Sequence, residues 1–203
     1  INRGIELDKQ NDTLPIFKTV DSIFERENYL LKILAKKTGL NMDNILDFDL
    51  FLYATEKGDL VGIDQEFISA PKIDNLASVY TGITGLIEAT NEDHINVFVG
   101  FDNEEIGSAT KQGADSNYLL NILERIYKSL NYDRNAFLQS LHNSFLLSSD
   151  GAHAAHPAHV EKSDPTNRVK LNEGIAVKIS ANQKYTSDGY SIGVIKQLLE
   201  GTN

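Results

Sequence analysis

The sequence predicts an α/β protein in which helices cover a largely buried sheet. Its 203 residues are 41% hydrophobic, which is enough for one sizeable core or for one core with a smaller lobe. From Pro71 onward, segments of helical periodicity alternate with short apolar runs, and this alternation is typical of an α/β layer domain. The pattern changes near residue 68, which indicates a domain boundary there.

The segments before this boundary predict one helix, one strand and a hairpin. In residues 21–38 apolar side chains recur at close to the helical period, and Gly39 follows as a C-cap. Residues 45–53 alternate acidic and apolar side chains, which is the period of a half-buried strand. Residues 56–60 resemble a turn and residues 61–69 a second strand, so we expect a hairpin.

The segments after the boundary predict four helices and three buried strands. The helices are expected over residues 75–90, 116–130, 133–141 and 188–200. The apolar runs expected to form strands are residues 95–101, 144–148 and 175–180. Continuous apolar runs of this length are typical of strands that are buried on both faces.

The composition limits the partners that the chain can have. Asp and Glu number 29 against 19 Lys and Arg, so the formal net charge of −10 argues against nucleic acid or an anionic membrane as the main partner. There is no cysteine, and any transition metal would be held by carboxylates and imidazoles. No apolar run approaches the roughly 18 residues of a membrane span, and residues 1–20 do not resemble a leader. We therefore expect a soluble, cytoplasmic protein.

Two adjacent carboxylates, Glu104 and Glu105, come shortly after the predicted strand 95–101. Like charges side by side are unfavourable when both are desolvated, so the pair suggests a cation beside it. The alternative is a solvated helix start, where such pairs are common.

Two further acidic residues stand at comparable places. Asp74 comes just before the predicted helix 75–90, either as its N-cap or as a ligand. Asp150 opens a loop, residues 148–159, that holds three of the five histidines and could also be a solvated turn. Ligands of open α/β sheets usually bind at such strand ends. With Glu104 and Glu105, these residues would supply the four carboxylates that a two-metal site needs.

Three segments also resemble a known family. APKIDNL at residues 70–76, DNEEIGS at 102–108 and SDGAHAAHP at 149–157 resemble, in this order, the central motifs of the M18 aminopeptidases, the aspartyl aminopeptidase family. Residues 182–185 and the strand at 45–53 are similar to the family as well, so the resemblance covers nearly the whole chain.

The resemblance implies an architecture and an activity. It implies a three-layer zinc-peptidase domain with an inserted β-rich dimerisation domain that is only partly present. Residues 1–67 would belong to the dimerisation domain and residues 68–203 to the zinc domain. Family members are metalloaminopeptidases that remove N-terminal amino acids from peptides with two divalent ions per subunit, expected to be zinc. They form dimer-based homo-oligomers, commonly a dodecamer.

The same resemblance assigns roles to individual residues. Asp74 would bridge the two zinc ions, and Glu105 and Asp150 would each be a terminal ligand. Glu104 would be the general base, and His153 would contact the substrate near the metals. His156 is expected to support its loop through hydrogen bonds.

The sequence departs from the family in two respects. The family's upstream His-x-Asp motif and its C-terminal histidine ligand have no counterpart, so the chain looks like the middle of a longer protein and is expected to be inactive alone. A lysine precedes the glycine of the segment matching residues 171–174 in members that favour acidic N-terminal residues, but Glu173 stands here. Its charge would repel an acidic side chain, which favours neutral or basic ones. A one-residue shift of the loop would instead leave Glu173 exposed and without a role.

Two other functions stay open at this point. The chain could be a non-catalytic module, a degenerate homologue that holds a divalent ion for structure or recognises a basic partner. It could also belong to another amidohydrolase with the same metal pair, such as a deacylase or a carboxypeptidase.

Overall fold

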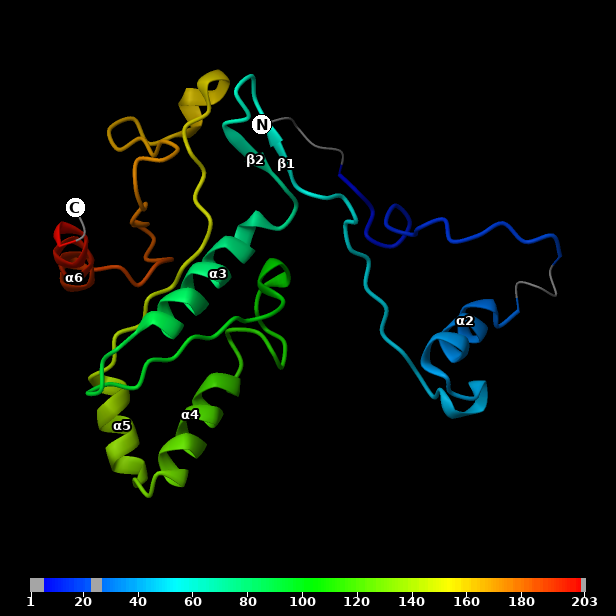
Figure 1. The fold of residues 1–203 in the computed structure, drawn as a ribbon, viewed down its shortest axis with the longest axis horizontal. Coiled ribbons are helices and arrows are strands. Elements are labelled where there is room, and N and C mark those ends of the chain that lie inside the picture. Colours follow the sequence, from blue (N-terminus) through cyan, green and yellow to red (C-terminus); the bar gives the residue numbers. More distant parts are fainter. Residues whose placement is uncertain (1–5, 23–26, 202–203) are drawn as a thin grey trace. The chain divides into compact units, whose positions relative to one another are not determined.

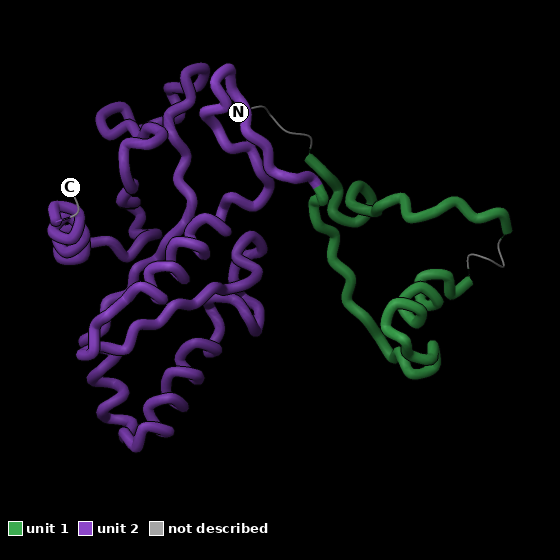
Figure 2. Tube along the Cα trace, in the orientation of Figure 1, with its two compact units in different colours: residues 1–55 green, residues 56–203 purple. Residues whose placement is uncertain are grey.

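The computed structural model describes residues 6–22 and 27–201 of the chain. The backbone separates into two compact units, residues 1–55 and residues 56–203 (Figure 2). The assignment of residues 1–67 and 68–203 to two family domains stays a prediction, because compactness of the backbone does not identify a domain's role.

The first unit contains the helix α2, Tyr29–Thr38 (Figure 1). It ends at Gly39, as predicted: this residue has φ 73°, and its N–H donates to the carbonyl of Ala35 at 2.9 Å. A φ in this range favours glycine, which has no Cβ to clash with the backbone. The predicted helix 21–38 is longer than α2, and its residues 23–26 lie outside the described residues.

The strand predicted over residues 45–53 is not formed. A short 3₁₀ helix, η1 (Met42–Asn44), precedes an irregular segment in which Leu46 is 95% exposed and Phe51 85% exposed. Among the described residues of this unit no strand lies beside the segment to accept its hydrogen bonds. Without a neighbour there is no sheet face to bury, and the alternation of acidic and apolar side chains predicted the wrong structure here.

The second unit begins with a β-hairpin that differs from the predicted one, whose first strand at residues 45–53 is not formed. Strands β1 (Asp59–Val61) and β2 (Phe67–Ser69) pair antiparallel, with Leu60 opposite Ile68. The turn lies between them and not at residues 56–60, where it was expected. Gly62 explains the difference, because its φ of 103° allows the chain to reverse there and its carbonyl accepts from the Gln65 N–H at 3.3 Å.

Four α-helices of this unit agree with the sequence to within about two residues. They are α3 (Ile73–Glu88), α4 (Tyr118–Ser129), α5 (Arg134–His142) and α6 (Gly189–Glu200). Side-chain caps start two of them: Asp133 accepts from the N–H of Ala136, and Asp188 forms a capping box with Ser191. None of the helices in the described part of the chain has the length and apolarity that a bilayer crossing requires.

The three buried strands predicted in this unit are not paired. In the described residues the sheet consists of β1 and β2 alone, and residues 95–101, 144–148 and 175–180 run as irregular chain. The first of these segments still packs on α3, where a Cβ added to Gly82 would come within 2.6 Å of the Phe98 ring. Residues 95–101 therefore contact α3, as expected of a segment covered by a helix. The buried sheet itself is not formed among the described residues.

Helices α4 and α5 form a helical hairpin (Figure 1), and it contains the one apolar side chain that is buried among the described residues of this unit. Phe137 is 4% exposed, and the centre of its ring lies 5.5 Å from the centre of the Tyr127 ring. The centres of the Tyr127 and Tyr132 rings lie 5.7 Å apart. The Tyr127 hydroxyl donates a hydrogen bond to the Ser140 hydroxyl at 2.5 Å. Aromatic pairs at such distances add to the stabilisation that burial provides.

We expect Phe137→Ala to lower the free energy of unfolding of the hairpin by about 3 kcal/mol, because it removes a buried ring and leaves a cavity. Local hydrogen exchange of the α4 and α5 amides measures this. Leu138→Ala is the matched control on the same helix, since this side chain is 50% exposed. Equal losses in the two variants would contradict the assignment of Phe137 as the anchor.

Candidate functional site

The two adjacent glutamates lie in the 3₁₀ helix η2, Glu104–Ile106. Asn103 before it and Gly107 after it both adopt left-handed backbone, with φ of 61° and 101°. Both carboxylates are exposed. The premise of a desolvated pair is therefore wrong, and the described structure shows the alternative, a solvated helix start.

The loop that carries η2 is closely folded. Gly113 lies against the Ser108 carbonyl, where an added Cβ would come within 2.0 Å of the oxygen, so only glycine fits. The side-chain amide of Asn103 donates to the Thr110 hydroxyl at 2.9 Å and closes the loop from the other side. The direction of η2 is thus set by contacts within its own loop.

Asp74 lies in the irregular first turn of α3. Its φ and ψ of −82° and 108° and those of Asn75 are not helical, and the peptide bond between them is cis. The N-cap position belongs to Lys72, so the interpretation of Asp74 as the N-cap is wrong. The Asn75 side-chain amide donates to the carbonyl of Ser149 at 2.8 Å, which ties the start of α3 to the loop before Asp150.

Asp150 forms an ion pair with Lys178. The Lys178 ammonium donates to Asp150 Oδ2 at 2.5 Å and to the Gly151 carbonyl at 2.7 Å. The hydrogen bond from Lys178 is the main reason why the pKa of Asp150 lies below 3.8, although desolvation opposes the shift. A hydrogen bond with the Asp74 side chain lowers this pKa further.

The structure brings Asp74 and Asp150 together. The Asp74 carboxyl group lies over Gly151, because a Cβ added there would stand 3.0 Å from both Asp74 Cγ and Oδ1. With the bond from Asn75 to Ser149, two contacts join α3 to this loop. Two of the four predicted carboxylates therefore meet, although the strand expected to lead to Asp150 is not formed in the described residues.

The two other predicted carboxylates do not join this pair. Among residues 6–22 and 27–201 no three acidic or imidazole side chains gather closely enough to hold a metal ion. The hard oxygen donors of Asp74 and Asp150, with the Lys178 ammonium already beside them, fit part of a zinc site, which needs three or four ligands. The ligand roles of Asp74, Glu105 and Asp150 and the base role of Glu104 stay predictions.

The histidine loop is arranged by local contacts. His156 caps the 3₁₀ helix η3 (Pro157–Lys162), because its Nδ1 accepts from the N–H of Ala158 at 3.1 Å. This confirms the supporting role expected of His156. His159 stacks near it with ring centres 5.5 Å apart, and His153 is exposed. A substrate contact through His153 stays a prediction.

Glu173 occupies a tight turn and is exposed. Asn172 and Gly174 on either side have φ of 61° and 101°. The carboxylate pairs with the Lys170 ammonium at 2.9 Å. Glu173 thus has a charged partner within its own loop, although it is exposed as the shifted-loop alternative expects.

Sequence reasoning missed Lys178. This residue is the one charged side chain in the apolar run of residues 175–180, and such an interruption was the available signal. A charge within an apolar run needs a partner, and Asp150 provides it across 28 residues of sequence.

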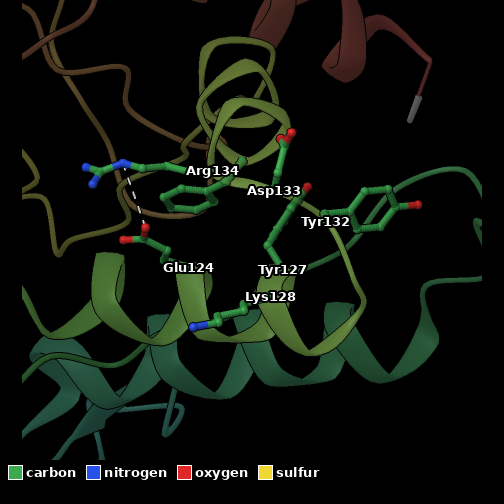
Figure 3. Close-up of a pocket in the computed structure, with 7 residues that line it drawn as sticks. Glu124, Tyr127, Lys128, Tyr132, Asp133 and Arg134 are labelled. Carbon is green, nitrogen blue, oxygen red and sulfur yellow. Dashed lines mark ion pairs between the residues drawn. The ribbon is translucent and has the colours of Figure 1, made fainter.

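A pocket between α4 and α5 contains none of the predicted site residues (Figure 3). The ion pair of Arg134 with Glu124 at 3.8 Å is formed by two of the residues that line it. The lining residues are Glu124, Tyr127, Lys128, Tyr132, Asp133, Arg134 and Phe137. The pocket is therefore separate from the carboxylate pair.

Comparison with known proteins adds independent information. The family described as "Aminopeptidase I zinc metalloprotease (M18)" matches residues 1–203. The "Probable M18 family aminopeptidase 2" of Clostridium novyi is 54% identical over 198 residues, which are 98% of this chain and 46% of that protein. An "Aspartyl aminopeptidase" of Aspergillus oryzae is 38% identical over 196 residues, or 90% of this chain and 39% of that protein.

A solved structure also matches. The structure of mApe1 from Chaetomium thermophilum superposes with a TM-score of 0.70 at 31% identity and covers 94% of this chain and 44% of that one. The chain spans about half the length of the curated relatives it matches.

We expect Gly151→Ala to weaken Zn²⁺ binding by the full-length protein about tenfold, because the new methyl group would displace the Asp74 carboxylate. Competition with a chelator measures the affinity. Gly193→Ala in α6 is the control, since nothing stands within 4 Å of its added Cβ. Unchanged affinity in Gly151→Ala would show that Asp74 is not held against this loop when zinc binds.

Proposed function

Because the chain belongs to the aminopeptidase I zinc metalloprotease (M18) family, we propose that it forms part of a zinc-dependent aminopeptidase. The proposal concerns the full-length protein, since the chain spans 46% of its relative from Clostridium novyi. The observation that carries it is the family match over residues 1–203, and the Asp74–Asp150 pair supports it from the structure.

We assign the carboxylates as follows. Asp74, Asp150 and Glu105 would be the carboxylates of this chain that hold zinc, with Asp74 shared between the two ions and each of the others a ligand of one. Bound zinc would polarise the first peptide carbonyl and lower the pKa of water. The further ligands, which include the family's two histidines, lie outside the matched motifs of this chain.

Glu104 is the general base in this proposal. Its carboxylate takes a proton from the attacking water and returns it to the leaving amine. Its place next to Glu105 suits this division of work, because successive residues of a 3₁₀ helix point about 120° apart. One side chain can then bind the metal while its neighbour faces the substrate.

The substrates are peptides with a free N-terminal amine, and the preferred N-terminal residue is neutral or basic. Glu173 stands where family members with an acidic preference have lysine, and its charge disfavours a second carboxylate nearby. Lys170 pairs with Glu173 and offsets part of its charge, so we expect the discrimination against acidic N-terminal residues to be partial.

We further propose that the full-length protein assembles into a homo-oligomer built from dimers, namely a dodecamer. Residues 1–67 would contribute to the dimerisation domain, and the exposed apolar side chains of Leu46 and Phe51 are of the kind that an interface covers. Residues 95–101 and 175–180 would pair with other strands in a three-layer domain. The composition without cysteine is compatible with the reducing cytoplasm, where we place the protein.

We expect Glu104→Gln in the full-length protein to lower kcat for aminoacyl substrates by about 10²–10⁴-fold, because the amide cannot accept the proton. Zinc content should stay near two ions per chain, as metal analysis can show. Glu88→Gln, a change of an exposed acid at the end of α3, is the control. Unaltered kinetics in Glu104→Gln would refute the base role, and the absence of hydrolysis by the unmodified full-length protein would favour a non-catalytic module.

We expect kcat/KM for aminoacyl substrates to be higher with neutral or basic N-terminal residues than with Asp or Glu. Glu173→Lys should shift this ratio toward acidic residues by removing the repulsion. A panel of aminoacyl and N-acetylated peptides measures both effects. A preference for acidic residues in the unmodified protein would refute the proposed specificity, and cleavage of the N-acetylated peptides would indicate a deacylase or carboxypeptidase.

A further inference from the structure

We propose that Lys178 is a positioning residue that holds the Asp150 carboxylate in the orientation in which it can bind a cation. The inference rests on the proposed function, because it concerns the same candidate site. It adds a residue for which the sequence motifs predicted no role.

The geometry of the Lys178 ammonium supports this role. Its Nζ lies 2.5 Å from Asp150 Oδ2 and 2.7 Å from the Gly151 carbonyl oxygen. The ammonium therefore donates hydrogen bonds both to the side chain of Asp150 and to the backbone of Gly151. A surface ion pair would have one contact, as Lys170 has with Glu173. The Lys178 side chain is 29% exposed against 63% for Lys170, so it is the more sheltered of the two.

The ammonium contacts one of the two carboxylate oxygens of Asp150. Lys178 binds Oδ2, whereas no hydrogen bond in the described residues is donated to Oδ1 by a cationic side chain. Asp74 lies on the same side of the loop, over Gly151. A cation that binds Asp74 and Asp150 together would find the second carboxylate already oriented.

The loop is also held at its other end. The Asn75 amide donates to the Ser149 carbonyl at 2.8 Å, so residues 149–151 are tied to α3 on one side and to Lys178 on the other. Hydrogen bonds to the groups that ligate a metal orient them, and their loss typically weakens metal binding 10–100-fold. Lys178 has the contacts expected of such a group.

The opposite role would be competition, in which the ammonium occupies the carboxylate and keeps a metal ion away. The second bond, to the Gly151 carbonyl, favours positioning, because it fixes the backbone of the loop and not only the charge of the carboxylate. The two roles predict opposite changes in zinc affinity, so one measurement separates them.

The test uses the full-length protein and four variants. Lys178→Met removes the ammonium but keeps the apolar stem, and Lys178→Gln is a second neutral variant in case the first does not fold. Lys178→Arg keeps the charge and two donors. Lys128→Met, a change of an exposed lysine on α4, is the matched control.

We expect Zn²⁺ affinity, measured by competition with a chelator, to fall 10–100-fold in both neutral variants and to recover in large part in Lys178→Arg. The control should bind like the unmodified protein. KM for an aminoacyl substrate at saturating zinc should change less than kcat, because Lys178 acts through Asp150. In zinc-stripped protein, amide exchange at residues 149–152 should be faster in the neutral variants.

Two results would overturn the inference alone: zinc affinity within twofold of the unmodified protein in the neutral variants, or tighter binding, which would establish competition. In both cases the unmodified protein would still bind zinc and cleave aminoacyl substrates. If the unmodified protein did neither, the proposed function would fail and the inference with it.

Discussion

A carboxylate that lies close to a second one is stabilised by a positive charge, and in this chain Lys178 provides that charge for Asp150, the neighbour of Asp74. The candidate site depends on this contact, because it joins three segments that are distant in sequence. The loop at residues 149–151 contacts two other segments. Asn75 at the start of α3 donates to Ser149, and Lys178 of the segment 175–180 donates to Asp150 and to the Gly151 carbonyl. Glycine at position 151 lets the Asp74 carboxyl group approach the loop, which a methyl group would prevent.

The remaining structure of the second unit is stabilised locally. The hairpin of α4 and α5 buries Phe137 among aromatic rings and closes with a hydrogen bond between Tyr127 and Ser140. The loop that carries η2 is shaped by its own contacts at Gly113 and Asn103. Contacts between segments distant in sequence include those of α3 with Phe98 and with the Asp150 loop. The candidate site lies at the second of these contacts.

The accuracy of the sequence predictions followed the range of the interactions involved. Helices α3, α4, α5 and α6 were predicted closely, because helical periodicity and caps such as Asp133 and Gly39 act within a few residues. The strands at 45–53 and 95–101 were predicted from apolar pattern alone and are not formed, since a strand requires hydrogen bonds from a neighbour that the pattern does not specify. The predicted hairpin of residues 45–53 and 61–69 is not formed, and the chain reverses instead within residues 61–67, where Gly62 adopts the positive φ.

The candidate site divides in the same way. The sequence by itself determined the acidic character, the absence of thiolate ligands, the family and the four carboxylates to consider, because residue type and motif order are properties of the chain alone. Only the tertiary structure decided that Asp74 and Asp150 meet, that Glu104 and Glu105 face water on η2, and that Lys178 belongs to the site. The reason is physical: a contact across 28 residues depends on where the intervening chain turns, and no local pattern records that distance.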